Sequence, residues 1–269
     1  MLDASEGAVE EPRLEQTSSI PVSESLFEWS SPPDALTLPR DQVHVWKIPL
    51  DQPERALRIL KHTLTSDERL KAERFHFDRD RRRFIAAHGQ LRMILGRYTG
   101  IDPHELEFSY GLYGKPFFAF PPASTLRFNL SHSGELALVA IAHGRDLGVD
   151  LEEIRALDDA ARIAKRFFTR RENAALCALP EADRVEAFFC CWTLKEAYMK
   201  ATGQGLSRAT DSFDVAFARG EPARLLRVEG EPQEEIRWSL MGLTPARGYV
   251  GAIAVEGHRW SIECWEARG

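Results

Sequence analysis

Apolar and polar residues follow regular periods along this chain from Val43 onward. A period of two is typical of a strand with one buried face, and a period near 3.6 is typical of an amphipathic helix. The longer period predicts helices near residues 54–64, 66–75, 81–98, 160–177 and 182–202. The shorter one predicts strands near residues 42–50, 105–109, 125–130, 135–142, 146–154, 212–217, 223–228, 236–241, 249–255 and 260–267. This mixture of elements predicts an α+β protein.

The order of the predicted elements recurs once along the chain, because helices lead into a series of short strands twice. The two long helices share a spacing: Leu91, Arg92, Arg97 and Gly100 match Leu194, Lys195, Lys200 and Gly203. Matching spacing of this kind indicates an internal duplication. It favours a division into an N-terminal half, residues 42–144, and a C-terminal half, residues 145–269.

Residues 1–41 differ from the rest of the chain. Four glutamates (Glu6, Glu10, Glu11 and Glu15) precede a stretch rich in serine and proline, and neither period is sustained there. A segment with so little apolar surface gains little from packing, so ordering it is unfavourable. We therefore expect a loosely ordered N-terminal extension.

Composition narrows the class of protein. The chain has 269 residues, of which 43% are hydrophobic, enough for a sizeable core. Neither a signal peptide nor an apolar run of about 20 residues is evident, so we expect a cytoplasmic protein without a membrane span. The net charge of -6 argues against nonspecific nucleic-acid binding. The four cysteines show no CxxC spacing, which favours free, buried thiols.

Two acidic side chains share one face of a predicted strand. Leu147, Val149 and Leu151 alternate with Gly148, Asp150 and Glu152, so the two carboxylates project together. An acidic pair of this kind is, taken alone, most often a solvated strand edge.

The segment Trp192–Lys200 predicts a helix in which Glu196 and Lys200 lie one turn apart on the same side. If this helix lies along the polar face of the strand, Glu196 joins Asp150 and Glu152, and Lys195 and Lys200 lie beside them. Three carboxylates suit Mg²⁺, which takes oxygen ligands and fills its remaining positions with water or phosphate oxygens.

A third segment, Asn129–Gly134, has the sequence NLSHSG and precedes the apolar run at residues 136–142. A strand that ends in small hydroxyl residues, histidine and glycine leaves backbone N–H groups and an imidazole available to an anion. The segment strengthens the prediction of a phosphate-binding metal site.

The motifs FNLSHSG, GVDLEEI and WTLKEAYMKATGQGLS occur together with Tyr113–Pro116 and with the helix start Arg81–Phe84. Their combination, order and spacing resemble the 4′-phosphopantetheinyl transferases, in particular the longer Sfp-type enzymes that activate carrier proteins. The resemblance covers roughly residues 42–260. It implies two similar α/β halves related by a pseudo-twofold axis, with the active site between them.

The resemblance also implies a reaction, in which the phosphopantetheine arm of coenzyme A moves to a serine of an apo acyl, peptidyl or aryl carrier protein, releasing adenosine 3′,5′-bisphosphate. It implies Asp150, Glu152 and Glu196 as ligands of Mg²⁺, and Glu196, Lys200 and His132 as catalytic residues. It implies coenzyme A contacts by Arg83, Lys115, Ser131, His132, Lys195 and Lys200. Phe84 departs from the pattern, because some relatives carry a hydroxyl residue there near the phosphate.

Two other functions share these residues. A metal-dependent phosphohydrolase would use the same three carboxylates, and a noncatalytic coenzyme A binding module would keep His132, Arg83 and Lys115. We expect a monomer that meets its carrier protein transiently. Residues 161–171, with five cationic and two aromatic side chains, are either a carrier-docking surface or an ordinary amphipathic helix.

Overall fold

Both long helices predicted from the sequence are present in the computed structural model, which describes residues 27–120, 125–205, 208–218 and 220–267. The N-terminal half contains β1 (Gln42–Pro49), α1 (Glu54–Thr63), α2 (Ser66–Glu73), α3 (Asp78–Thr99), β2 (Glu107–Tyr110), β3 (Pro116–Phe120), β4 (Leu126–Ser133) and β5 (Leu136–His143). The C-terminal half contains β6 (Leu147–Glu153), α4 (Ala160–Phe167), α5 (Arg170–Ala178), α6 (Glu181–Thr202), β7 (Phe213–Ala216), β8 (Arg224–Val228), α7 (Glu234–Arg237), β9 (Trp238–Leu243), β10 (Tyr249–Glu256) and β11 (Ser261–Glu266).

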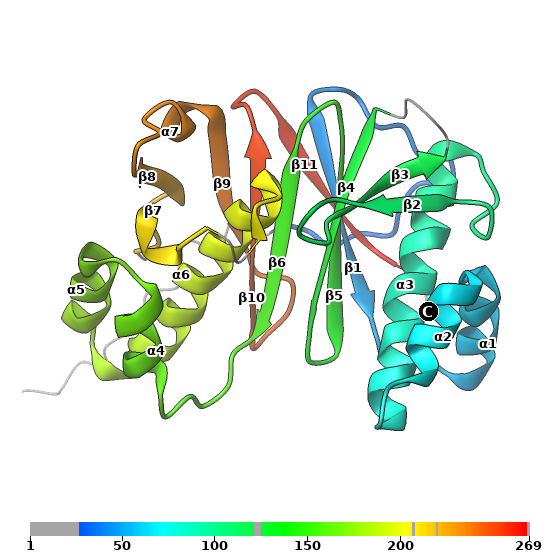
Figure 1. Ribbon diagram of the computed structural model, residues 1–269, viewed down its shortest axis with the longest axis horizontal. Coiled ribbons are helices and arrows are strands. Elements are labelled where there is room, and N and C mark those ends of the chain that lie inside the picture. Colours follow the sequence, from blue (N-terminus) through cyan, green and yellow to red (C-terminus); the bar gives the residue numbers. More distant parts are fainter. Residues whose placement is uncertain (1–26, 121–124, 206–207, 219, 268–269) are drawn as a thin grey trace, which may run out of the picture.

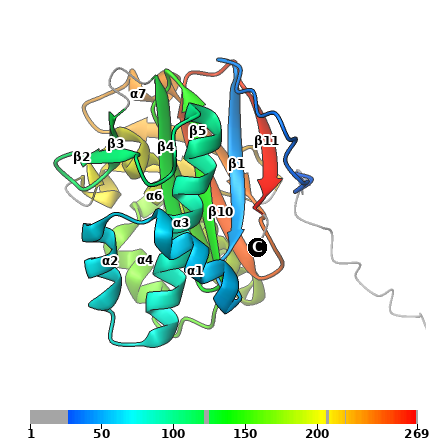
Figure 2. The ribbon, with the colours of Figure 1, turned by 90° about the vertical axis from the view of Figure 1, so that its right-hand side faces the viewer.

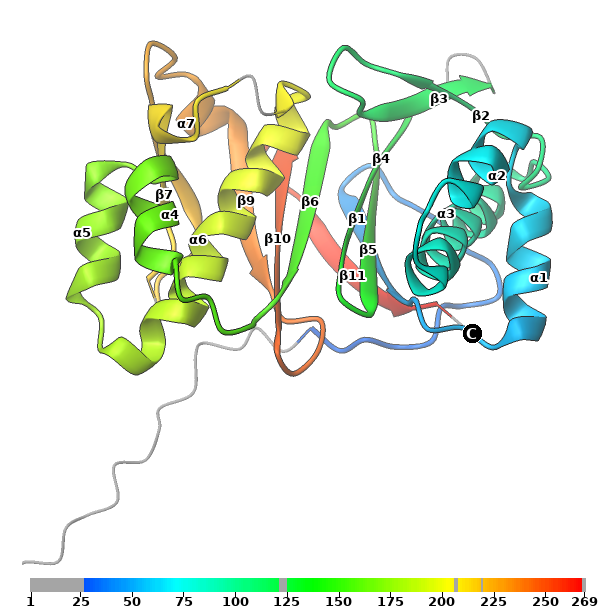
Figure 3. The same cartoon turned by 60° about the horizontal axis from the view of Figure 1, so that its bottom comes forward.

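Two sheets stand side by side at the centre of the molecule (Figure 1). One has the strand order β11-β1-β5-β4 and the other β6-β10-β9, while β2-β3 and β7-β8 form small two-stranded sheets. Helices α1 to α3 cover the outer side of the first sheet, as Figure 2 shows, and α4 to α6 flank the second (Figure 3). The described residues thus form two α/β halves, as the resemblance implied.

Three apolar clusters hold these layers together. One lies between α1–α3 and the first sheet, one between α4–α6 and the second sheet, and the third between the two sheets. Val45, Leu138, Val149 and Ile253 are among the fully buried members of the central cluster. Burial on both faces explains why β5 and β10 are apolar almost throughout rather than alternating.

The two halves repeat the same helical unit. Helices α3 and α6 are each 22 residues long and each ends at a glycine with left-handed backbone, Gly100 at φ 70° and Gly203 at φ 68°. That conformation is readily available only to glycine, which explains both helix ends. The preceding helices also match, because Thr65 and Thr169 each open a helix with a capping box. The internal duplication predicted from spacing is therefore a structural one.

Several predicted boundaries are wrong. The helix expected over residues 160–177 is two helices, because Thr169 caps the start of α5 after the chain has turned at Phe168. Strand β3 was not predicted, and residues 234–237 form a helical turn before β9. The last strand, β11, leaves the C-terminal half and pairs in parallel with β1. Residues 261–266 therefore belong to the sheet of the N-terminal half, which corrects the expectation that the C-terminal half runs to residue 269.

The prediction of a loose extension over residues 1–41 is wrong for its last part. Ser30 pairs with Trp265 beside β11, its N–H donating to Cys264 O, and Phe27 and Trp29 pack on the central apolar cluster. Arg97 of α3 donates to Pro33 O at 2.6 Å. Residues 27–41 are thus packed on the body of the protein, whereas residues 1–26 lie outside the described residues. No described helix is long and apolar enough to cross a membrane.

Candidate active site between the two halves

The acidic strand β6 lies against β4 of the other half. Ser131 Oγ donates to Asp150 Oδ1 at 2.9 Å, and Ser133 Oγ donates to Glu152 Oε2 at 2.8 Å. Deeper along the strands, Asn129 Oδ1 accepts from Val149 N at 2.9 Å. Side chains at positions 129, 131 and 133 share one face because of the two-residue period. We call this line of contacts between β4 and β6 the seam.

Helix α6 approaches the seam unusually closely, and Gly148 is the reason. A Cβ atom at position 148 would lie 2.2 Å from Ala197 O and 2.3 Å from Ala201 N, distances that no carbon atom can adopt. The absence of a side chain lets the helix backbone rest directly on β6. This contact brings Lys200 onto the strand, where its Nζ donates to Asp150 Oδ1 at 2.6 Å and to Ser131 Oγ at 2.9 Å.

Glu196 lies one turn before Lys200 and is half-buried. Burial raises its pKa, the charge of Asp150 raises it further, and Lys200 offsets part of the effect. Burial likewise raises the pKa of Glu152, against the hydrogen bond from Ser133. The seam thus concentrates negative charge, which Lys200 offsets at Asp150 and Arg155 offsets at Glu152.

The donor set fits a hard divalent cation. Asp150 Oδ2 is buried and has no hydrogen-bond partner among the described residues, which is costly unless another positive group meets it. The three carboxylates are nevertheless not assembled as a closed cluster: in the described ranges no group of three histidine, cysteine, aspartate or glutamate side chains is close enough to hold a metal. Lys200 instead compensates Asp150.

His132 lies on the opposite side of β4 from Ser131 and Ser133, as strand alternation requires. It is exposed there and close enough to His88 of α3 to influence the pKa of that residue, which burial lowers to about 4. Partial burial lowers the pKa of His132, the charge of Lys200 lowers it further, and Asp150 raises it, so His132 borders α3 while lying within electrostatic range of the seam.

Arg83 and Lys115 flank the seam, and both have protein partners. Arg83 donates to both oxygens of Asp51, at 2.8 and 2.9 Å, and to Gly134 O at the β4–β5 turn. Lys115 Nζ donates to Leu147 O and Ala201 O, each at 2.9 Å, and burial lowers its pKa to about 8. It thereby ties the β2–β3 hairpin to the start of β6 and the end of α6. A cavity of about 450 Å³ opens beside it, lined by Lys115, Phe117, Phe128, Arg127, Asp146 and Thr202 among others.

The predicted coenzyme A contact of Lys195 is wrong in this structure. Its ammonium lies in the core of the C-terminal half, 2% exposed, and donates to both oxygens of Glu172. Successive helix residues are about 100° apart, so Lys195 cannot share the direction of Glu196. Asn129 and Ser133 belong to the segment predicted to meet an anion, but no site role of their own was predicted, although their alternation with Ser131 could have revealed it.

Comparison with known proteins places this chain in a family. Residues 146–254 match the model of the 4′-phosphopantetheinyl transferase superfamily, and residues 49–144 match the N-terminal domain of a 4′-phosphopantetheinyl transferase. The chain is 45% identical to the 4′-phosphopantetheinyl transferase HetI of Nostoc sp. over 88% of this chain and 97% of that protein. It is 32% identical to the 4′-phosphopantetheinyl transferase Sfp of Bacillus subtilis over 62% of this chain and 71% of that one. A solved structure of the Chronobacterium ammoniagenes ACPS–CoA complex matches with a TM-score of 0.33 and 20% identity, over 43% of this chain and 98% of that one.

Proposed function

The chain belongs to the 4′-phosphopantetheinyl transferase superfamily, Sfp-type, and we propose that the seam is where it moves phosphopantetheine from coenzyme A to a carrier protein. It is thus an enzyme whose substrates are coenzyme A and apo carrier proteins. The observation that carries the placement is the convergence of Asp150, Glu196 and Lys200 where α6 rests on β6.

We propose Asp150, Glu152 and Glu196 as the residues that hold Mg²⁺. All three provide the carboxylate oxygens that this ion prefers. Among the described residues, Asp150 Oδ2 has no hydrogen-bond partner, so this oxygen is available to coordinate the ion. When bound, the ion neutralises negative charge that develops on a pyrophosphate.

The chain's own residues account for the remaining steps of the proposal. The serine oxygen of the carrier forms a bond to the β-phosphorus of coenzyme A, the pyrophosphate P–O bond breaks, and adenosine 3′,5′-bisphosphate leaves. Glu196 accepts the proton of the serine hydroxyl as general base. Lys200, now shared by Asp150 and Ser131, turns to the α-phosphate and stabilises the leaving group.

Residues beside the seam bind the rest of coenzyme A. Ser131, which contacts Lys200 in the seam, and His132, on the other side of β4, are the proposed contacts of the nucleotide's phosphates. Arg83, next to the β4–β5 turn, now pairs with Asp51 and Glu135 and would exchange these carboxylates for a phosphate of coenzyme A. The cavity beside Lys115 offers room for a further part of the molecule. We further propose that the enzyme acts as a monomer in the cytoplasm, where coenzyme A is available.

Mass spectrometry of apo carrier proteins tests this function directly. We expect each accepted carrier to gain one phosphopantetheine when incubated with the enzyme, coenzyme A and Mg²⁺, and to gain none with the Asp150→Ala variant. Free phosphopantetheine formed without a carrier would support a phosphohydrolase instead. Coenzyme A binding without turnover of any carrier would support a binding module.

A further inference from the structure

A buried ion pair lies behind the face of α6 that carries Glu196 and Lys200. Lys195 Nζ donates to the two oxygens of Glu172 at 2.7 and 2.8 Å, and to Phe213 O at 2.7 Å. The side chains of Lys195 and Glu172 are 2% and 1% exposed. Removal of either partner would leave an uncompensated charge in the interior, so the two side chains depend on each other.

Glu172 connects three elements. One of its oxygens accepts from Thr169 N at the start of α5, and the other accepts from Val215 N of β7, both at 2.9 Å. Lys195 comes from the middle of α6 and completes the network. The pair therefore fixes α6 to α5 and β7 by directional bonds, in addition to apolar packing.

The opposite side of α6 rests on β6 at Gly148, where the backbone of Ala197 and Ala201 meets the strand. Contact with a glycine restricts how close the helix lies but offers no side chain to define its rotation. The ion pair with Glu172 adds a directional restraint from the other side, beside the hydrogen bond from Tyr198 to Glu234. Rotation of α6 decides in turn whether Glu196 and Lys200 point at the seam.

The N-terminal half provides independent support. Arg92, which matches Lys195 in the duplication, pairs with Glu68 at 2.7 Å, and Glu68 belongs to the capping box of α2 as Glu172 does to that of α5. In α3, Met93 stands where α6 has Glu196. In both halves, therefore, a buried cation on the long helix pairs with the capping-box glutamate of the preceding helix and holds the long helix in place.

We propose that Lys195 is a positioning residue for phosphopantetheinyl transfer, which, by pairing with Glu172, sets the rotation of α6 and so places Glu196 and Lys200 over β6. This inference rests on the proposed function of the seam. A displacement of about 1 Å at a reacting group can cost about 100-fold in rate, so even a small rotation of α6 would lower turnover.

Three variants of the pair and one matched control test the inference. Lys195→Met removes the charge at similar length, Lys195→Arg restores the cation found at Arg92, and Lys195→Met combined with Glu172→Gln leaves no buried charge unpaired. Arg92→Met breaks the equivalent pair in the other half. For each variant, kcat and KM for coenzyme A, thermal unfolding, and hydrogen exchange of residues 195–202 are measured.

We expect Lys195→Met to lower kcat about 10-fold to 100-fold, with KM for coenzyme A changed less than about threefold, and to speed exchange in α6. Lys195→Arg should keep kcat within about fivefold. The double variant should regain thermal stability without regaining kcat. Arg92→Met should lower thermal stability while kcat stays within about threefold, because α3 carries none of the proposed metal ligands and neither Glu196 nor Lys200, and Arg83 lies more than two turns before Arg92.

Recovery of both stability and kcat in the double variant would overturn the inference, since the pair would then act on stability alone. If Lys195→Met does not fold, the double variant and Lys195→Arg decide the question in the same way. Failure of the wild-type enzyme to modify any carrier would refute the proposed function instead. Hydrogen exchange still tests positioning in that case, and unchanged exchange in α6 of the double variant would refute it.

Discussion

Gly148→Ala is the substitution whose effect can be worked out most fully from the structure. The new Cβ would lie 2.2 Å from Ala197 O, whereas carbon–oxygen contacts are about 3.3 Å or longer. Helix α6 would have to retreat from β6 by about 1 Å. The Lys200–Asp150 contact, now 2.6 Å, would then exceed hydrogen-bond length.

Two measurable effects follow from this displacement. Overpacking should destabilise the protein by about 1–3 kcal/mol, a fall of a few degrees to about 10 °C in Tm for a chain of this size. Misplacement of Lys200 and Glu196 by about 1 Å should lower kcat about 100-fold. A carrier-modification assay with varied coenzyme A, together with thermal unfolding, measures both.

Gly242→Ala is the matched control, because position 242 lies in β9 of the same sheet and a Cβ there would meet nothing within 4 Å. We expect it to leave Tm and kcat close to wild type. A Gly148→Ala variant with wild-type kcat and Tm would refute the reasoning, since α6 would then not need its close approach to β6.

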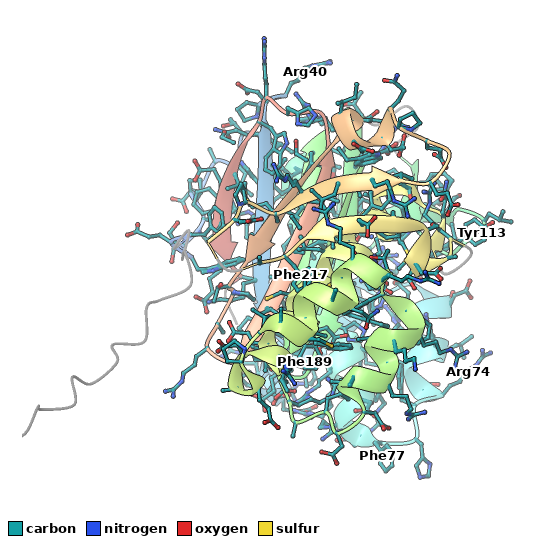
Figure 4. The ribbon with its side chains drawn as sticks, turned by 90° about the vertical axis from the view of Figure 1, so that its left-hand side faces the viewer. Arg40, Arg74, Phe77, Tyr113, Phe189 and Phe217 are labelled. Carbon is teal, nitrogen blue, oxygen red and sulfur yellow. The ribbon has the colours of Figure 1, made fainter. Side chains whose placement is uncertain are left out.

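Three further predictions concern the base, the N-terminal segment and the partner. Glu196→Gln should lower kcat about 100-fold or more with a much smaller effect on coenzyme A binding, and near-normal carrier modification would exclude Glu196 as the base. Removal of residues 1–26 should leave the rate of carrier modification within a few-fold of normal. Removal of residues 1–41 should in addition lower Tm, because residues 27–41 pack on β11 and α3. Equal Tm values for the two truncations would contradict this. Helices α4 and α5 lie on the outer surface seen in Figure 4 and carry exposed cations that should attract an acidic carrier. The double variant Arg166→Glu, Arg170→Glu should therefore raise KM for the carrier at low salt and leave the affinity for coenzyme A unchanged. An unchanged KM across a salt titration would place docking elsewhere.

Local sequence was sufficient for the features that depend on near neighbours in the chain. The helices α3 and α6 were predictable because long periodic segments end at Gly100 and Gly203, where the backbone needs a left-handed residue. Asp150 and Glu152 were predictable as a pair because alternation in a strand places them on one face. The internal duplication was also predictable, because matched residue spacing in two helices can be recognised without knowing how the helices pack.

Contacts between distant segments were decided only by the tertiary structure. Lys195 and Glu196 are adjacent in sequence, yet the packing of α6 between β6 and α5 sends one into the core and the other toward the seam. Strand β11 completes the sheet of the other half because β1 leaves an edge there, a pairing across more than 200 residues that no local period encodes. Lys115 was predicted as a site residue from the motif Tyr113–Pro116, but its backbone partners Leu147 and Ala201 belong to distant segments, so only the packing of the two halves reveals these contacts.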